Sequence, residues 1–311
     1  MELSILLVKQ IGSLFLIILS GCIAQKCNIV KFEDSKALSK LCLYLIFPCV
    51  IIDSYQIEYS REKMLGLLLA IIAGIVVHII YIALSYGIKK IITISSIEEA
   101  SLIYSNAGNL IIPLVAYVLG PEWVFYCSAY LAVQTVFVWT HGKSIIREVR
   151  DYDLKQLLLN PNIIATILGM LLFVTNTSLP SVVGHAITVT GSMVGPISMI
   201  ITGIIIGNMD LKKVFNNVRA YMVSAARLII YPLITVLLFC FSGMVSWHPQ
   251  AEKILLIVLL ASAAPTASMI TQLAQVYDKD SYNASVINVV SILFCIITMP
   301  AIVYIYQVLS S

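Results

Sequence analysis

Long apolar runs, separated only by short polar segments, limit the folds that this chain can adopt. Of its 311 residues, 60% are hydrophobic and only 11% are charged, and the mean hydropathy is +0.97. Soluble domains carry about 25% charged residues, so this chain has too little polar surface to cover a water-soluble globule. A membrane-spanning helix needs about 20 apolar residues, and the runs therefore predict an all-α polytopic membrane protein.

Counting the runs predicts ten transmembrane helices. They cover residues 3–25, 38–55, 64–88, 100–118, 122–142, 161–176, 181–208, 219–243, 253–276 and 283–306. The connections between them are short, so no soluble domain is expected. The longest polar interval is residues 143–162, between the fifth and sixth spans.

The first run ends in LSGC, residues 19–22, which is similar to the cleavage box of a lipoprotein signal peptide. The residues before the run are not basic, because the chain starts Met-Glu. Basic residues follow the run instead, beginning with Lys26 and Lys31. We therefore interpret residues 3–25 as the first transmembrane helix rather than as a signal peptide.

The distribution of Lys and Arg predicts the orientation in the membrane. Loops that follow odd-numbered spans hold 14 of the 19 basic residues, and the loops on the other side hold 3. Lys9 and Arg227 lie within spans. Because cytoplasmic loops carry the excess of positive charge, the odd-to-even loops are expected in the cytoplasm and both termini outside, in a plasma (inner) membrane protein.

Ten spans divide into two halves of five. The predicted domains are a first repeat at residues 1–142, a cytoplasmic linker at residues 143–160 and a second repeat at residues 161–311. Because five is odd, the second half would enter the membrane upside down relative to the first. This 5+5 inverted repeat is typical of secondary transporters.

Helix-breaking residues fall at matching places in the two halves. Span four contains SNAGNLIIP and span nine contains ASAAPTASMITQ. Pro48 lies in the motif LIFPCV of span two, and Pro196 lies in the motif MVGPIS of span seven. A lone proline can be a simple kink, which stays open for Pro48 and Pro196. Small, polar and breaking residues coincide in spans four and nine, which favours broken helices that line a cavity. Their half-helix N-termini would suit a carboxylate.

These motifs resemble the auxin efflux carrier family in its bacterial form with a short central loop. SNAGNLIIPL, SAAPTA, LIFPCVII and the closing VYDKDSYNASVINVVSILFCIITMPAIVYIY carry the resemblance, which covers essentially the whole chain. It implies that broken helices four and nine cross and that the protein is a homodimer. It also implies an elevator mechanism, in which a scaffold of spans 1, 2, 6 and 7 carries a moving transport domain of spans 3–5 and 8–10.

The resemblance also implies a substrate site at the crossing. The role of the family's span-four asparagine carries over to Asn106 and Asn109, with the choice between them left open. Pro113 and Pro265 would shape the crossing, and Thr266 follows in the same motif.

Other polar residues inside spans are candidates for the same cavity, although amides between helices also serve packing. They are Gln134, Gln272, Gln275 and Asn288. Arg227 in span eight costs at least about 2.5–3.5 kcal/mol in a membrane, so it should either pair with an anionic substrate or extend to the headgroups. His78 is a candidate proton carrier, or else a hydrogen-bonded structural histidine.

The function expected from these features is secondary transport of a small organic anion, such as malate, malonate or an auxin-like aromatic acid. An uncoupled anion channel or a membrane sensor that does not transport stays open as an alternative. An enzyme is not expected: the spans hold no pair of aspartates and no HExxH, and nothing favours Ser105 and His78 as a Ser–His pair. No cofactor, metal or nucleic-acid partner is expected, and coupling to H+ or Na+ is left open.

Overall fold

The computed structural model describes residues 2–149, 155, 158–210, 214 and 216–310, and in these ranges the side chains from residue 12 onward except that of Gln275. The first half of the described chain contains α1 (Glu2–Lys26), α2 (Asp34–Leu41), η1 (Cys42–Ile46), α3 (Phe47–Ser54), α4 (Arg61–Ile91), α5 (Ser96–Ile103), η2 (Ala107–Ile111), α6 (Ile112–Val118), η3 (Pro121–Trp123), α7 (Val124–Phe137), η4 (Val138–Gly142) and α8 (Lys143–Arg147).

The second half of the described chain is also helical. It contains α10 (Pro161–Val174), α11 (Ser181–Ser192), α12 (Val194–Asn208), α14 (Val218–Ala225), η5 (Ala226–Ile230), α15 (Tyr231–Phe241), η6 (Met244–Trp247), α16 (Ala251–Ala263), α17 (Ser268–Val276) and α18 (Ser281–Ser310). The prediction of an all-α fold is confirmed for the described residues, whose only β-type pairing is one isolated bridge.

Six helical segments of the described chain are long and apolar enough to cross a membrane. They are Asp34–Ser54, Arg61–Ile91, Pro121–Arg147, Ser181–Asn208, Val218–Phe241 and Ser281–Ser310. Shorter apolar helices cover Gly12–Lys26, Ala107–Val118 and Pro161–Val174. The membrane character of the fold is thus confirmed, while the count of ten spans stays a prediction.

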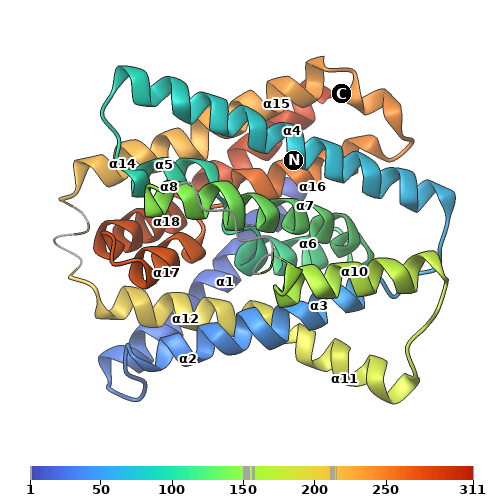
Figure 1. Cartoon of the computed structure of the whole chain (residues 1–311), viewed down its shortest axis with the longest axis horizontal. Coiled ribbons are helices and arrows are strands. Elements are labelled where there is room, and N and C mark those ends of the chain that lie inside the picture. Colours follow the sequence, from blue (N-terminus) through green and yellow to red (C-terminus); the bar gives the residue numbers. More distant parts are fainter. Residues whose placement is uncertain (1, 150–154, 156–157, 211–213, 215, 311) are drawn as a thin grey trace.

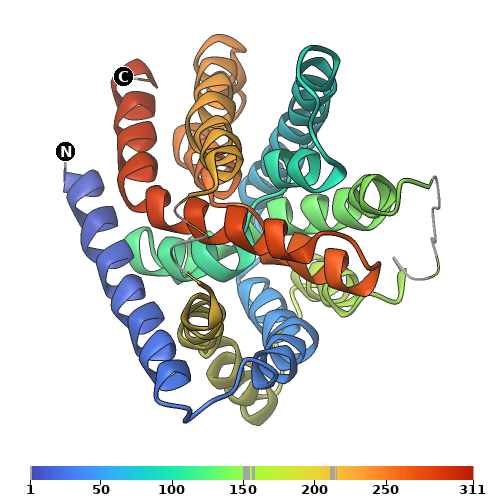
Figure 2. The same ribbon diagram turned by 90° about the vertical axis from the view of Figure 1, so that its left-hand side faces the viewer.

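The helices form two sides with an inner layer between them (Figure 1). Helices α2, α3, α11 and α12 lie along one side, and α4, α14 and α15 lie along the other. Helix α1 covers an outer edge beside α12 and α18 (Figure 2). It packs closely on α12 because Gly203 has no side chain: a Cβ there would lie 2.0 Å from the carbonyl oxygen of Ile18.

Three helical segments contain a π turn that ends two residues before a proline. The turns η1, η2 and η5 end at Ile46, Ile111 and Ile230, and Pro48, Pro113 and Pro232 follow. Proline lacks a backbone donor and its ring clashes with the preceding turn. A widened turn is one way in which a helix accommodates both effects, so these prolines bend their helices without ending them.

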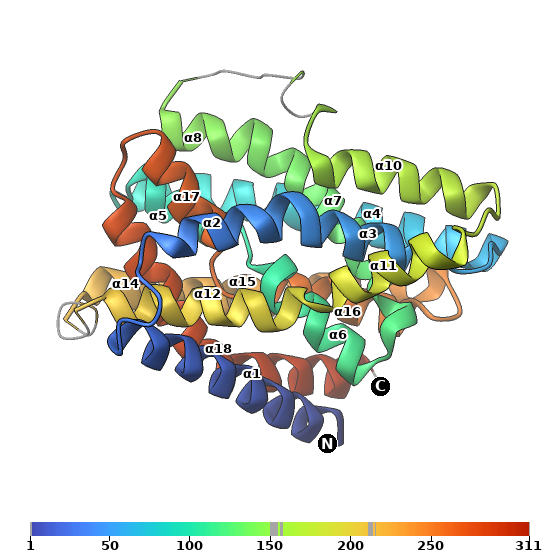
Figure 3. The same ribbon diagram turned by 90° about the horizontal axis from the view of Figure 1, so that it is seen from below.

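Two helical segments are interrupted at their middles, and the interruptions meet. The chain leaves α5 after Ile103 and resumes helix at Ala107, and it leaves α16 after Ala263 and resumes at Ser268. Ser105 and Thr266 form an antiparallel bridge between the two gaps. Helices α5 and α17 lie toward one end of the molecule and α6 and α16 toward the other (Figure 3). We call the bridged residues 104–106 and 264–267 the crossing.

Candidate functional site

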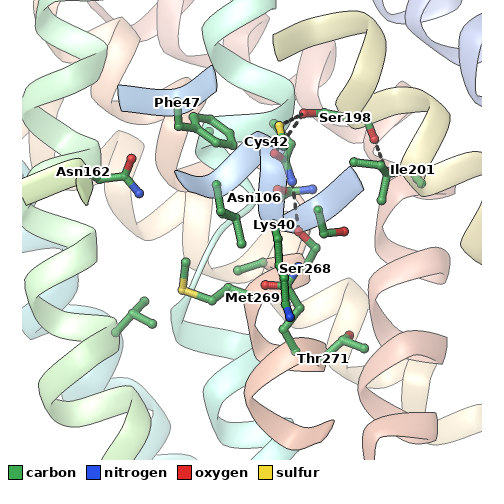
Figure 4. Close-up of a pocket in the computed structure, with 18 of the residues that line it drawn as sticks. Lys40, Cys42, Phe47, Asn106, Asn162, Ser198, Ile201, Ser268, Met269 and Thr271 are labelled. Carbon is green, nitrogen blue, oxygen red and sulfur yellow. Dashed lines mark hydrogen bonds between the residues drawn. The ribbon is translucent and has the colours of Figure 1, made fainter. Parts of the chain in front are cut away.

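A cavity of about 460 Å³ lies beside the crossing (Figure 4). Its walls come from many elements, and its lining residues include Cys42, Phe47, Ser105, Asn106, Gly108, Asn109, Leu131, Gln134, Asn162, Ser198, Ser268, Met269, Thr271, Gln272 and Asn288. The two interrupted segments thus contribute to one cavity, together with η1, α3, α7, α10, α12 and α18.

The cavity also extends along α2 and the residues just before it. Phe32, Lys36 and Lys40 line it there, and both lysines are exposed. None of the described residues that line the cavity is acidic. The net positive charge of the lining favours an anion over a cation as its occupant.

The crossing itself is held by backbone hydrogen bonds. The Asn106 amide donates to the carbonyl oxygen of Pro265 at 2.7 Å, and the Ala267 amide donates to that of Tyr104 at 3.0 Å. These bonds satisfy backbone groups that the interrupted helices leave without intrahelical partners.

Gln134 on α7 supports the first interruption. Its Oε1 accepts hydrogen bonds from the Ser105 amide at 3.1 Å and from the Ser105 hydroxyl at 2.6 Å, and its Nε2 donates to the Ser105 carbonyl at 2.9 Å. The side-chain amide therefore replaces the helical partners that Ser105 lacks, although Gln134 also faces the cavity.

Asn288 and Ser291 on α18 support the second interruption in the same way. Asn288 Nδ2 donates to the Thr266 carbonyl at 2.6 Å, and Ser291 Oγ accepts from the Thr266 amide at 3.1 Å. The Thr266 hydroxyl donates to the carbonyl of Ser101 at 3.2 Å. Asn288 lines the cavity, whereas Pro265 and Thr266 lie in the crossing outside the lining.

Asn106 and Asn109, three positions apart, have different surroundings. The Asn106 side chain is 6% exposed, lines the cavity and forms no hydrogen bond with a described residue. In contrast, Asn109 Nδ2 donates to Ser268 Oγ at 2.9 Å, and its Oδ1 accepts from Ser198 Oγ at 3.1 Å. The Asn106 amide is thus free to bind a ligand, whereas Asn109 joins η2 to α17 and α12.

Two further candidates contribute to the site differently. Gln272 on α17 is half-buried in the cavity wall and, like Asn106, has no hydrogen bond to a described residue. Pro113 does not line the cavity; it lies in the first turn of α6 and packs against α12 at Gly195, where a Cβ would be 3.1 Å from its ring. The Gln275 side chain falls outside the described residues.

Arg227 and His78 lie outside the cavity lining, and both are 0% exposed. Arg227 donates to two backbone carbonyls instead of reaching a ligand or the membrane surface. His78 Nδ1 lies 2.7 Å from the Gly74 carbonyl, which identifies Nδ1 as the protonated nitrogen, and the ring stacks on Phe137 with centroids 5.1 Å apart. Neither side chain touches the cavity in this conformation.

Several cavity residues were not among the sequence candidates. Ser198 and Ser268 lie in the quoted MVGPIS and ASAAPTASMITQ motifs, yet a single serine in an apolar span gives no signal of its own. Phe47 precedes Pro48, for which the sequence predicts no more than a possible kink. Lys36 and Lys40 were counted only for their charge in orienting the chain.

No group of three His, Cys, Asp or Glu side chains among the described residues could hold a metal ion. The polar cavity between interrupted apolar helices is instead the arrangement of a membrane transport protein. The family described as Membrane transport protein matches the chain over residues 6–154 and 143–303. The chain belongs to this family, which is the auxin efflux carrier family of transporters. No curated protein matches the sequence.

Proposed function

We propose that the protein is a secondary carrier for a small organic anion, such as malate, malonate or an auxin-like aromatic acid. The observation that carries this proposal is the Asn106 side chain, an unpaired amide in a cavity whose charged lining residues are Lys36 and Lys40. An amide donor held at the cavity wall suits a carboxylate, and the two lysines would attract the anion toward it.

The N-terminal end of α17 adds a second attraction for a carboxylate. Ser268 and Met269, the first residues of this nine-residue helix, line the cavity. The first amides of a helix lack intrahelical acceptors and carry a partial positive charge. A carboxylate between Asn106 and this helix end would meet donors on both sides of the crossing.

We further propose alternating access by an elevator motion of an inverted repeat. The support is that Gln134 holds Ser105 in the first half just as Asn288 and Ser291 hold Thr266 in the second. Residues 1–142 and 161–311 would be the two repeats, with the scaffold from spans 1, 2, 6 and 7. A homodimer in the plasma membrane with both termini outside completes the proposal.

The first experiment is a thermal-shift screen of organic acids on the purified full chain, with and without Na+ and at two pH values. A ligand that binds only the folded protein raises its Tm, so the screen identifies the anion and any coupled ion together. Counterflow in proteoliposomes then distinguishes a carrier from a channel and from a sensor. Saturable exchange of the identified acid supports a carrier, linear flux without exchange indicates a channel, and binding without flux indicates a sensor.

The Asn106→Ala variant tests the site itself. Removing a hydrogen bond to a charged ligand costs about 1.5–3 kcal/mol, so the affinity for the identified acid should fall roughly 10- to 100-fold. The Tm without ligand should not change, because the side chain has no hydrogen-bond partner among the described residues. Thr135→Ala, which removes a cavity-lining hydroxyl already bonded to the Leu131 carbonyl of its own helix, is the matched control and should bind normally. Equal affinity in Asn106→Ala and wild type would refute the assignment.

A further inference from the structure

Arg227 places a permanent positive charge where two interrupted helices end. Its Nη2 donates to the carbonyl oxygen of Ser262 at 2.6 Å, and its Nη1 donates to that of Leu102 at 3.4 Å. Ser262 is the residue before the end of α16, and Leu102 is the residue before the end of α5. One guanidinium therefore contacts the carboxyl ends of α5 and α16, the two half-helices that precede the crossing in the sequence.

The surroundings of Arg227 contain no opposite full charge. The side chain is 0% exposed and forms no ion pair with a carboxylate of the described residues. Its guanidinium carbon lies 5.5 Å from the centre of the Tyr81 ring, and its Nε has no hydrogen-bond partner in the part of the chain that the structure describes. The last carbonyls of a helix lack intrahelical donors and together carry a partial negative charge. The carboxyl ends of α5 and α16 and the aromatic face of Tyr81 together balance the positive charge of the guanidinium.

In carriers built from broken helices, unwound carbonyls and half-helix carboxyl ends commonly coordinate the coupling Na+ or H+. We propose that Arg227 is a built-in cation that occupies this position, so that the crossing takes up no Na+ and the carrier binds its anion without Na+. This inference rests on the proposed carrier function. A guanidinium stays protonated at any physiological pH, so this position also cannot release a proton to drive transport.

Arg227 is held there by its own helix. It lies within the π turn η5, which ends two residues before Pro232. Arg219, one helix element earlier, instead pairs with Glu98 through Nε–Oε1 and Nη2–Oε2 contacts of 2.6 and 2.8 Å and is largely exposed. The chain thus offers a second arginine from the same helical segment as a control that does not touch the crossing.

The test measures the Tm of the purified full chain in NaCl, KCl and choline chloride at equal ionic strength, without any organic anion. Wild type should give the same Tm in all three salts. Arg227→Ala should lower the Tm in choline chloride by about 5–10 °C. NaCl or dilute guanidinium chloride should then restore part of the loss, because either cation can enter between the Leu102 and Ser262 carbonyls. Arg227→Lys should keep most of the Tm and gain no response to Na+.

The Arg219→Ala/Glu98→Gln double variant is the matched control: it removes an arginine of the same helical segment together with the carboxylate that it pairs with, so it should lose stability without any response to Na+ or to dilute guanidinium. A Tm of wild type that rises specifically in NaCl would overturn the proposal. So would an Arg227→Ala protein as stable as wild type, or one that neither cation stabilises. If Arg227→Ala cannot be purified, wild type and Arg227→Lys decide, since a response to Na+ in either contradicts a built-in cation. No organic anion is present, so these outcomes do not depend on whether the proposed substrate binds.

Discussion

At Gly108 the ring of Phe47 fills the space that a side chain would occupy. A Cβ at this position would lie 2.7 Å from Phe47 Cε1 and 2.9 Å from Cζ. Both residues line the cavity, so the close contact between η2 and α3 helps to set its shape. The glycine is needed here for space, whatever its effect on the helix.

Gly108→Ala should therefore push Phe47 aside and disturb the cavity. Overpacking of this kind costs about 1–3 kcal/mol, so we expect a lower Tm and a weaker affinity for the acid that the screen identifies. Gly87→Ala on α4 is the control, because nothing lies within 4 Å of its added Cβ. A Gly108→Ala protein that matches Gly87→Ala in both Tm and affinity would show that Phe47 moves without consequence.

The sequence identifies Asn106 and Asn109 as candidate site residues but does not distinguish their roles. Both are amides in a broken span, and the family resemblance left the choice between them open. Hydrogen bonds to Ser198 and Ser268, which are 89 and 159 positions away from Asn109, separate the two in the structure. Contacts this distant in sequence depend on the packing of whole helices and leave no local pattern.

At the scale of elements, each interruption of a helix is stabilised by side chains of a neighbouring helix. Gln134 on α7 serves Ser105, and Asn288 on α18 serves Thr266. The positions of the interruptions followed from Pro, Gly and Asn in the sequence, because these residues weaken a helix locally. Which helix would supply the missing partners could not follow, because amides in apolar spans serve cavities and packing alike.

Gln134→Leu and Asn288→Leu should each destabilise the fold. Both leave buried backbone groups of the crossing without a partner, at a cost of about 1–3 kcal/mol per group. Gln134 holds both the amide and the carbonyl of Ser105, whereas Ser291 still holds the Thr266 amide in Asn288→Leu. We therefore expect a greater loss of Tm for Gln134→Leu. Equal stability of both variants and wild type would mean that water replaces the lost partners.

The surroundings of Arg227 also depend on contacts between helices. Its depth in the eighth span allowed either a substrate partner or a side chain that extends to the headgroups. The structure places it instead against the Leu102 and Ser262 carbonyls, on two other elements. Distance along one helix cannot predict that neighbouring helices end beside it.

Across the full chain, the predicted orientation groups the basic loops on one face of the membrane. Cys27 lies in the α1–α2 connection and is exposed. In a variant that keeps Cys27 as its only cysteine, a membrane-impermeant maleimide should therefore label the protein from the cytoplasmic side only. The control is Ser60→Cys in a background without any of the seven native cysteines, since the connection before α4 belongs to the opposite side and should react from outside. The same side for both cysteines would contradict the proposed topology.

The all-α membrane fold was predictable at this scale because apolar runs and interface charges are local features of the chain. Most boundaries of the predicted spans fall within a few residues of helix ends, as with residues 181–208 and the segment Ser181–Asn208. The bridge at the crossing could not be predicted from such local features, since Ser105 and Thr266 are far apart in the sequence.

The contact between Ser198 and Asn109 has a consequence for turnover. The bonds of Gln134 and Asn288 lie within the proposed moving domain, so a stroke would leave them intact. The Ser198–Asn109 bond joins this domain to α12 of the proposed scaffold and would have to break and re-form in every cycle. Ser198→Ala should lower that barrier by about 1 kcal/mol and speed exchange about fivefold, with equilibrium affinity nearly unchanged. A slower or equal exchange rate would mean that this bond does not act as a brake.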